Sequence, residues 1–212
     1  DTAPCAQNLD TKSIIAGLDK LLFSGDDTAA GEYLDRWCKT AQEVGDWRAE
    51  LTLQSELMGF HRRTSDENAA MTAVERGLEL IRVHRLGSTV SGATIILNAA
   101  TTLKAYGMAE RSIPMFVQAC RVYSQTLDPL DYRFGGLYNN MALSYQDAGE
   151  LESAERHFLL ALEVMRFCQS PENDTAVTWC NLAELYEMRG DGERLGRGDH
   201  IKLCSSSFRY FL

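Results

Sequence analysis

The sequence predicts an all-α protein, a right-handed superhelical solenoid of about five antiparallel helix hairpins with an irregular C-terminal tail. Three observations lead to this fold class. Two segments, residues 137–149 and 178–190, align with their matching residues 41 positions apart. Apolar residues recur at offsets of three and four, which places them on one face of a helix. Only four prolines occur among 212 residues, so long helices are permitted along almost the whole chain.

The matching positions of the two segments carry aromatic, small and glycine residues. The pairs are Tyr138 and Trp179, Ala142 and Ala183, Tyr145 and Tyr186, and Gly149 and Gly190. Gly107 lies 42 residues before Gly149, and Gly25 closes a similar segment nearer the N-terminus. In the second unit Ser65 replaces the glycine, and the register slips by about one residue. A glycine at these positions is explained by a helix that ends in a left-handed residue.

A second amphipathic stretch follows each of the first four turns, with small and large residues at offsets of four, three and one. Small residues let two helices approach closely, and the adjacent large residues fill the groove beside them. The four sets are Ala30, Leu34, Trp37 and Cys38; Ala70, Val74, Gly77 and Leu78; Ser112, Phe116, Ala119 and Cys120; and Ala154, Phe158, Ala161 and Leu162.

These patterns divide the chain into elements in order. We expect an N-terminal extension (1–10), repeat units at about 11–50, 51–92, 93–134, 135–175 and from 176 to 190 or beyond, and an irregular tail or cap (191–212). Pro114 lies inside the expected second helix of the third unit, so that helix should begin near Ser112 or kink there. Four glycines between positions 190 and 198 disfavour a second helix in the fifth unit.

Units of helix, short turn and helix with this alternation of small and large residues resemble the tetratricopeptide repeat. The resemblance covers about residues 11–190 and is carried best by Tyr138–Leu162 and Trp179–Gly190. The period of 41 to 42 residues is similar to the long repeats of kinesin light chains, whereas the usual repeat has roughly 34. The resemblance implies a protein-interaction scaffold whose groove asparagines hold a peptide backbone.

In stacked hairpins the first helix of every unit lines the concave side, where extended peptides or helices bind. Asn98, Asn140 and Asn181 occupy the same repeat position, at spacings of 42 and 41 residues. An asparagine amide both donates and accepts hydrogen bonds, so this column can hold a peptide backbone; alternatively, it satisfies neighbouring helices without a ligand. The candidate peptide-binding residues are Asn98, Thr101, Lys104, Asn139, Asn140, Leu143, Gln146, Asp147, Asn181, Glu184 and Glu187.

Charge narrows the class of partner. Asp147, Glu184 and Glu187 make the C-terminal half of the expected groove acidic, which predicts a neutral or basic partner segment. The net charge of −9 disfavours a nucleic-acid partner, and no run approaches the roughly 18 apolar residues that a membrane span needs. We therefore expect a protein or peptide partner, with two alternatives open: self-association as a homodimer, or a sensor role within a larger regulator.

The sequence carries no catalytic or metal-binding motif, so we expect a protein that is not an enzyme and uses no metal or cofactor. His84 and His157 fall on charged helix faces, where we expect solvated side chains. His61, Arg62 and Arg63 form a charge cluster typical of the C-terminal end of a helix.

The six cysteines contain no C-x-x-C pair. Because a chain with this much apolar core does not need disulfides, we expect free thiols in a reducing compartment, the cytoplasm. Cys38 and Cys120 share a repeat position and are predicted to be small buried residues rather than nucleophiles.

Overall fold

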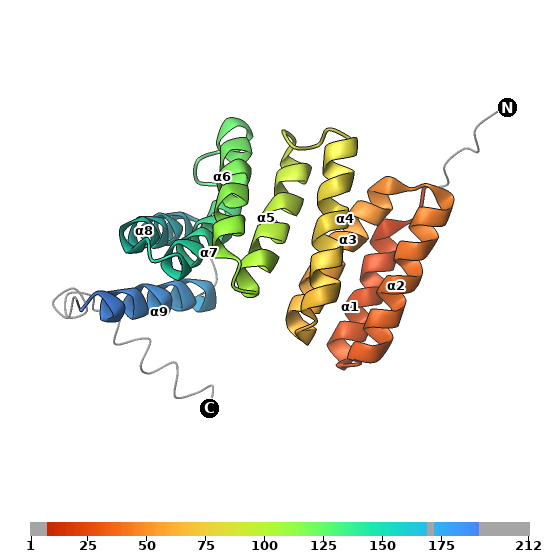
Figure 1. The fold of residues 1–212 in the computed structure, drawn as a ribbon, viewed down its shortest axis with the longest axis horizontal. Helices are drawn as coiled ribbons and strands as arrows, with labels where there is room; N and C mark the ends of the chain where they lie inside the picture. The colour runs from red at the N-terminus through yellow and green to blue at the C-terminus, as the bar shows by residue number, and fades with distance from the viewer. Residues whose placement is uncertain (1–7, 169–171, 191–212) are drawn as a thin grey trace. The chain divides into compact units, whose positions relative to one another are not determined.

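The computed structural model describes residues 8–168 and 172–190, and this part of the chain contains nine α-helices and no strand (Figure 1). The prediction of an all-α helical repeat fold is confirmed. The tail predicted over 191–212 and residues 1–7 of the predicted N-terminal extension lie outside the described residues. The helices are α1 (Thr11–Ser24), α2 (Asp27–Val44), α3 (Trp47–Thr64), α4 (Glu67–Val83), α5 (Val90–Ala105), α6 (Ala109–Thr126), α7 (Arg133–Asp147), α8 (Leu151–Phe167) and α9 (Glu172–Arg189).

The chain forms two compact units, residues 1–106 and 107–212. In the first unit each helix from α1 to α5 packs on the next, and α3 also contacts α5. In the second unit α6 packs on α7, α7 on α8 and α8 on α9, while α7 also contacts α9. Each unit therefore contains two first helices in direct contact, α3 with α5 and α7 with α9.

The turns that close the first helices have the predicted left-handed backbone. Gly25, Gly107, Gly149 and Gly190 have φ between +71° and +78°. Ser65 takes the same conformation, with φ +59°, so the second unit keeps the turn geometry without a glycine. A turn geometry that tolerates serine at a cost explains why the glycine pattern is interrupted there.

The first unit also carries a shorter period that the repeat comparison misses. A left-handed residue followed by aspartate recurs every 20 residues, at Gly25-Asp26, Gly45-Asp46 and Ser65-Asp66. Each aspartate accepts a hydrogen bond from the backbone N–H three residues later, at 2.9 to 3.1 Å, and so caps the next helix. The same short connection thus joins α1 to α2, α2 to α3 and α3 to α4.

The predicted small and large positions of the second helices form the core. The small residues Ala30, Ala70, Ser112 and Ala154 have no exposed surface. The large residues four positions later, Leu34, Val74, Phe116 and Phe158, are at most 1% exposed. Within the second unit the hydroxyl of Ser112 lies 2.9 Å from that of Ser144, so the one polar residue at a small position is satisfied.

The start of α6 corrects a prediction. The helix begins at Ala109 rather than near Ser112, and Pro114 is its sixth residue. A proline here removes the N–H that would bond to the carbonyl of Glu110. Both Pro114 and Glu110 are exposed, so water can satisfy that carbonyl and the helix can start earlier than the proline rule suggests.

A buried carboxylate in the first unit has no counterpart in the sequence prediction. Glu50 of α3 is 3% exposed and accepts two hydrogen bonds from Arg76 of α4, at 2.6 and 3.0 Å. It also accepts a bond of 2.8 Å from Gln42 of α2. Because a buried charge is tolerated when it is paired and hydrogen-bonded, this cluster ties three consecutive helices together.

The turn geometry predicts the effect of exchanging serine and glycine. Ser65→Gly should raise the free energy of unfolding by roughly 0.5 to 1 kcal/mol, because glycine adopts a positive φ without the strain of a side chain. Gly45→Ser, with φ +71° and open space around a Cβ, should lower it by a similar amount. Urea unfolding of both variants measures the effect, and a Ser65→Gly variant less stable than the native chain would contradict this account.

Candidate functional site

The first helices of the second unit, α7 and α9, present most of the predicted binding residues on one surface. We call this the α7–α9 surface; it comprises Asn139, Asn140, Leu143, Gln146 and Asp147 of α7 with Asn181, Glu184, Glu187 and Met188 of α9. Two hydrogen bonds cross it, each between residues 42 positions apart. The Nδ2 of Asn181 donates to the Oδ1 of Asn139 at 3.2 Å, and the Nε2 of Gln146 donates to the Sδ of Met188 at 3.3 Å.

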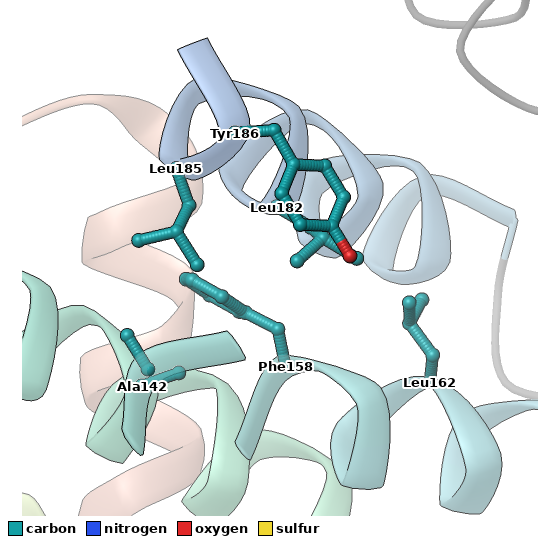
Figure 2. Close-up of a cluster of buried hydrophobic side chains, with 7 residues drawn as sticks. Ala142, Phe158, Leu162, Leu182, Leu185 and Tyr186 are labelled. Atoms are coloured by element: carbon teal, nitrogen blue, oxygen red, sulfur yellow. The ribbon is translucent and has the colours of Figure 1, made fainter. Parts of the chain in front are cut away.

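The apolar faces of the same helices determine how this surface is held. Leu182, Leu185 and Tyr186 of α9 point towards Phe158 and Leu162 of α8 (Figure 2). All five are buried, as is Ala142 of α7, which joins the same cluster. With one side of α9 committed to this core, the polar residues between the packing positions are left on the other side.

Ionic contacts to α8 reinforce the position of α9. The hydroxyl of Tyr186 donates to the Oε1 of Glu155 at 2.9 Å, and the guanidinium of Arg189 pairs with the Oε2 of Glu155 at 2.7 Å. Arg189 also lies 3.4 Å from Glu152. The half-buried Glu155 thus holds both α9 residues and fixes the C-terminal part of that helix against α8.

The exposed charge on the α7–α9 surface is acidic. Asp147, Glu184 and Glu187 are all exposed. The Oε1 of Gln146 is buried without a hydrogen-bond donor among the described residues. Exposed carboxylates beside a buried, unused acceptor favour ligands that bring positive charge or N–H groups.

In the first unit, α3 and α5 form a corresponding surface that carries Asn98, Thr101 and Lys104. We call it the α3–α5 surface. The Nδ2 of Asn98 donates to the carbonyl and hydroxyl oxygens of Ser55, at 2.9 and 2.8 Å. Its Oδ1 accepts a bond of 2.7 Å from the guanidinium of Arg62, which also donates to the hydroxyl of Thr102. Both ends of the Asn98 amide are therefore occupied by α3.

The three asparagines of the predicted column thus differ in what they contact. Asn98 and Asn181 each bond to the preceding first helix of their own unit, whereas the Nδ2 of Asn140 donates to the carbonyl of Gly136 in its own helix, at 3.0 Å. Thr101 likewise bonds within its helix, to the carbonyl of Leu97 at 2.9 Å. At Asn98 the structure therefore matches the alternative in which the asparagine satisfies a neighbouring helix.

Arg62 is the residue of the α3–α5 surface that the candidate set lacks. Burial lowers its pKa from the ordinary value, because the charged guanidinium is partly removed from water. A signal was present in the sequence: Arg62 lies 42 residues before Lys104, so the two share a repeat position. The cluster typical of a helix end is also present, since His61, Arg62 and Arg63 occupy the last turn of α3.

The other histidines correct the expectation of solvated side chains. His84 stacks on Trp47 with ring centroids 3.8 Å apart. His157 stacks on Tyr145 at 5.0 Å and lies 6.1 Å from Tyr138, while its Nδ1 is 2.7 Å from the carbonyl of Ser153. Both rings are held by aromatic neighbours on other helices, which the charge pattern of a single helix does not reveal.

The cysteines that the structure describes are free thiols: Cys38, Cys120, Cys168 and Cys180. Cys38 is buried as predicted, whereas Cys120 is only half-buried. Burial raises the pKa of the Cys38 thiol to about 12, and the carboxylates of Glu50 and Asp35 add to the shift. Cys5 and Cys204 lie outside the described residues.

Searches for other kinds of site give two shallow hollows. One, of about 410 Å³, lies between α8 and α9, and the other, of about 360 Å³, follows one face of α1 beside Lys12 and Asp19. Within the described ranges, no group of three or more histidine, cysteine, aspartate or glutamate side chains is placed to hold a metal ion. None of the helices described is long and apolar enough to cross a membrane.

Comparison with known proteins was made for sequence and for structure. Residues 134–193 match the family model of the tetratricopeptide repeat, whereas no curated protein matches the chain. Among solved structures, the chain is similar to a putative kinesin light chain with nearly identical TPR-like repeats from Podosopora anserina. The TM-score is 0.76 at 14% identity, covering 93% of this chain and 95% of that one.

Two bacterial structures resemble the chain over a comparable length. BtubC (BKLC) from P. vanneervenii gives a TM-score of 0.67 at 18% identity and covers 95% of this chain and 93% of its own. MamA from Desulfovibrio magneticus RS-1 gives a TM-score of 0.64 at 14% identity and covers 97% and 98%. At these identities the likeness concerns the helical repeat fold.

The contacts of the asparagines predict different effects on stability. Asn98→Ala should lower the free energy of unfolding by roughly 1 to 3 kcal/mol, because it leaves the half-buried Arg62 guanidinium and Ser55 without their partner. Asn140→Ala should change it by less than about 0.5 kcal/mol, since the lost bond stays within one exposed helix turn. Chemical denaturation of the two variants side by side provides the measurement, and equal losses would refute the structural role of Asn98.

The raised pKa of Cys38 predicts low reactivity. At pH 8.5 the Cys38 thiol should be alkylated by iodoacetamide at least about a hundredfold more slowly than in the urea-unfolded chain, because only the thiolate reacts. Mass spectrometry of the alkylated peptides over time measures this. The half-buried Cys120, at the same repeat position, serves as the internal control and should react earlier; similar rates for the two thiols would show that burial does not protect Cys38.

Proposed function

We propose that this chain, which belongs to the tetratricopeptide repeat family, is a non-enzymatic scaffold that holds a protein partner through the surfaces of its first helices. The observation that carries the proposal is the α7–α9 surface, where amide side chains, exposed carboxylates and an exposed methionine lie on two adjacent helices. Such a mixture suits an extended peptide, which presents alternating backbone donors and acceptors together with side chains.

The amide groups on this surface are suited to exchange their bonds for those of a ligand. Asn140 donates to a carbonyl of its own helix, which already accepts a bond from the helix backbone, and that donation can pass to a peptide carbonyl at little cost. Asn139 and Asn181 form one bond between them and keep further donor and acceptor capacity. The buried Oε1 of Gln146 is an acceptor that a ligand N–H would satisfy.

Apolar groups complement these polar contacts. Met188 and Val177 of α9 are 56% and 55% exposed, and Leu143 of α7 is half-buried beside the core cluster. Burial of exposed apolar surface gives most interfaces their affinity, while hydrogen bonds and charges select the partner. The carboxylates of Asp147, Glu184 and Glu187 favour a neutral or basic segment over an acidic one on this surface.

The cellular setting is part of the proposal. The free thiols of the four described cysteines support work in a reducing compartment, the cytoplasm. Because Cys38 is buried with a raised pKa, it acts as a small apolar core residue and supports the view of the chain as a binding protein.

The asparagines provide the test. The double variant Asn140→Ala with Asn181→Ala should weaken capture of a basic 12-residue peptide pool, read by fluorescence anisotropy, by about tenfold. The helical content from circular dichroism should stay unchanged, because neither asparagine lies in the apolar core. An acidic pool of otherwise equal composition should bind more weakly than the basic pool, and the difference should shrink at high salt.

The matched control is Asn68→Ala, which removes an exposed asparagine from the second helix α4 and should leave binding as it is. Equal binding by the double variant and the native chain would remove the asparagines from the site. Light scattering on the same samples tests self-association; a dimer that captures neither pool would contradict the scaffold function.

A further inference from the structure

The hollow between α8 and α9 lies where a hairpin partner is missing from the described residues. It has a volume of about 410 Å³ and is lined by Leu162, Glu163, Arg166, Thr175 and Trp179. In the first four hairpins a second helix follows each first helix, whereas no described helix follows α9. The hollow is thus bordered by the last described second helix, α8, and by a first helix with no described second helix of its own.

The preceding hairpin shows which face of α9 a second helix would meet. Tyr138 and Tyr145 of α7 both lie against His157 of α8, the second helix of their own hairpin. The residues 41 positions later are Trp179 and Tyr186 of α9. Trp179 lines the hollow, so the hollow opens on the face of α9 that corresponds to the α8-facing side of α7.

The sequence beyond α9 contains the pattern of a second helix. In all four complete hairpins the core positions of the second helix follow offsets of four, three and one, with a small residue first and a large one next. The same offsets recur at Cys204, Phe208, Phe211 and Leu212. Cys204 is small, Phe208 matches Phe116 and Phe158, and Leu212 matches Leu162. The aromatic Phe211 at the third position has a precedent in Trp37 of the first hairpin.

We propose that residues 201–212 form the second helix of the fifth hairpin and pack over the hollow between α8 and α9, with Phe208 against the face of α9 that carries Trp179. The segment then plays for α9 the part that α8 plays for α7. Phe158, the equivalent of Phe208, is fully buried between its own hairpin and the next helix. Burial of one such aromatic side chain is among the larger single contributions to the stability of a hairpin.

The distance along the chain permits this arrangement. The first core position follows the left-handed turn residue by five residues in the four complete hairpins, as from Gly149 to Ala154. From Gly190 to Cys204 the separation is 14, so the connection is nine residues longer. The ten residues 191–200, with three glycines, can span up to about 33 Å when extended, which is longer than a helix of 12 residues at about 18 Å.

Hydrogen exchange measured by mass spectrometry on the full 212-residue chain tests the proposal. Amides of residues 201–212 should exchange at least about tenfold more slowly than in a synthetic peptide of the same sequence. Phe208→Ala should abolish this protection and speed exchange in α9. Tyr210→Ala is the matched control, because position 210 lies between the core positions and faces away from them; it should keep the protection.

Each outcome decides the matter. Exchange of residues 201–212 at the peptide rate in the native chain overturns the proposal, and so does equal loss of protection in both variants. Protection that appears only at high protein concentration assigns the hollow to a second copy of the chain and also overturns it. Phe208→Leu, which keeps a large apolar side chain, should retain most of the protection, so a Phe208→Ala variant that unfolds altogether still leaves a measurable comparison.

Discussion

The structure depends on close approach of helices at a small residue that stands beside a large one. Phe158 shows why this contact supports more than one hairpin: it packs with Ala142 of its own first helix and with Leu185 of the next one. One side chain therefore stabilises both the hairpin and its stacking on the neighbour. A hairpin that lacks the next helix leaves such a residue exposed, and stacking of repeats is the direct consequence.

Polar groups between the first helices are satisfied in the same neighbour-to-neighbour manner. Asn98 joins α5 to α3 through Ser55 and Arg62, and Asn181 joins α9 to α7 through Asn139. These bonds hold adjacent first helices at a constant distance and order their side chains before any ligand binds. A surface ordered in advance loses less conformational entropy on binding, which favours affinity for an extended partner.

The two first-helix surfaces differ in charge, and this difference bears on what each accepts. The α3–α5 surface carries Arg62 and Lys104 at one repeat position, whereas the equivalent positions on the α7–α9 surface are Gln146 and Glu187. A basic segment suited to the second surface is repelled by the first, because charge complementarity has the opposite sign there. The expectation of a neutral or basic partner accordingly applies to the α7–α9 surface.

The sequence by itself determined the features that depend on nearby residues: the helices, the left-handed turns at Gly25 and Gly149, and the burial of Ala154 and Phe158. Helical periodicity and turn chemistry are local, so they can be read from spacing alone. Only the tertiary structure decided the roles of Asn98 and His84, whose partners lie 43 and 37 residues away on other helices. Residues of one type at one repeat position meet different neighbours, as Asn98 and Asn140 do, and the side chain that faces each of them is decided by packing between helices rather than by the repeat.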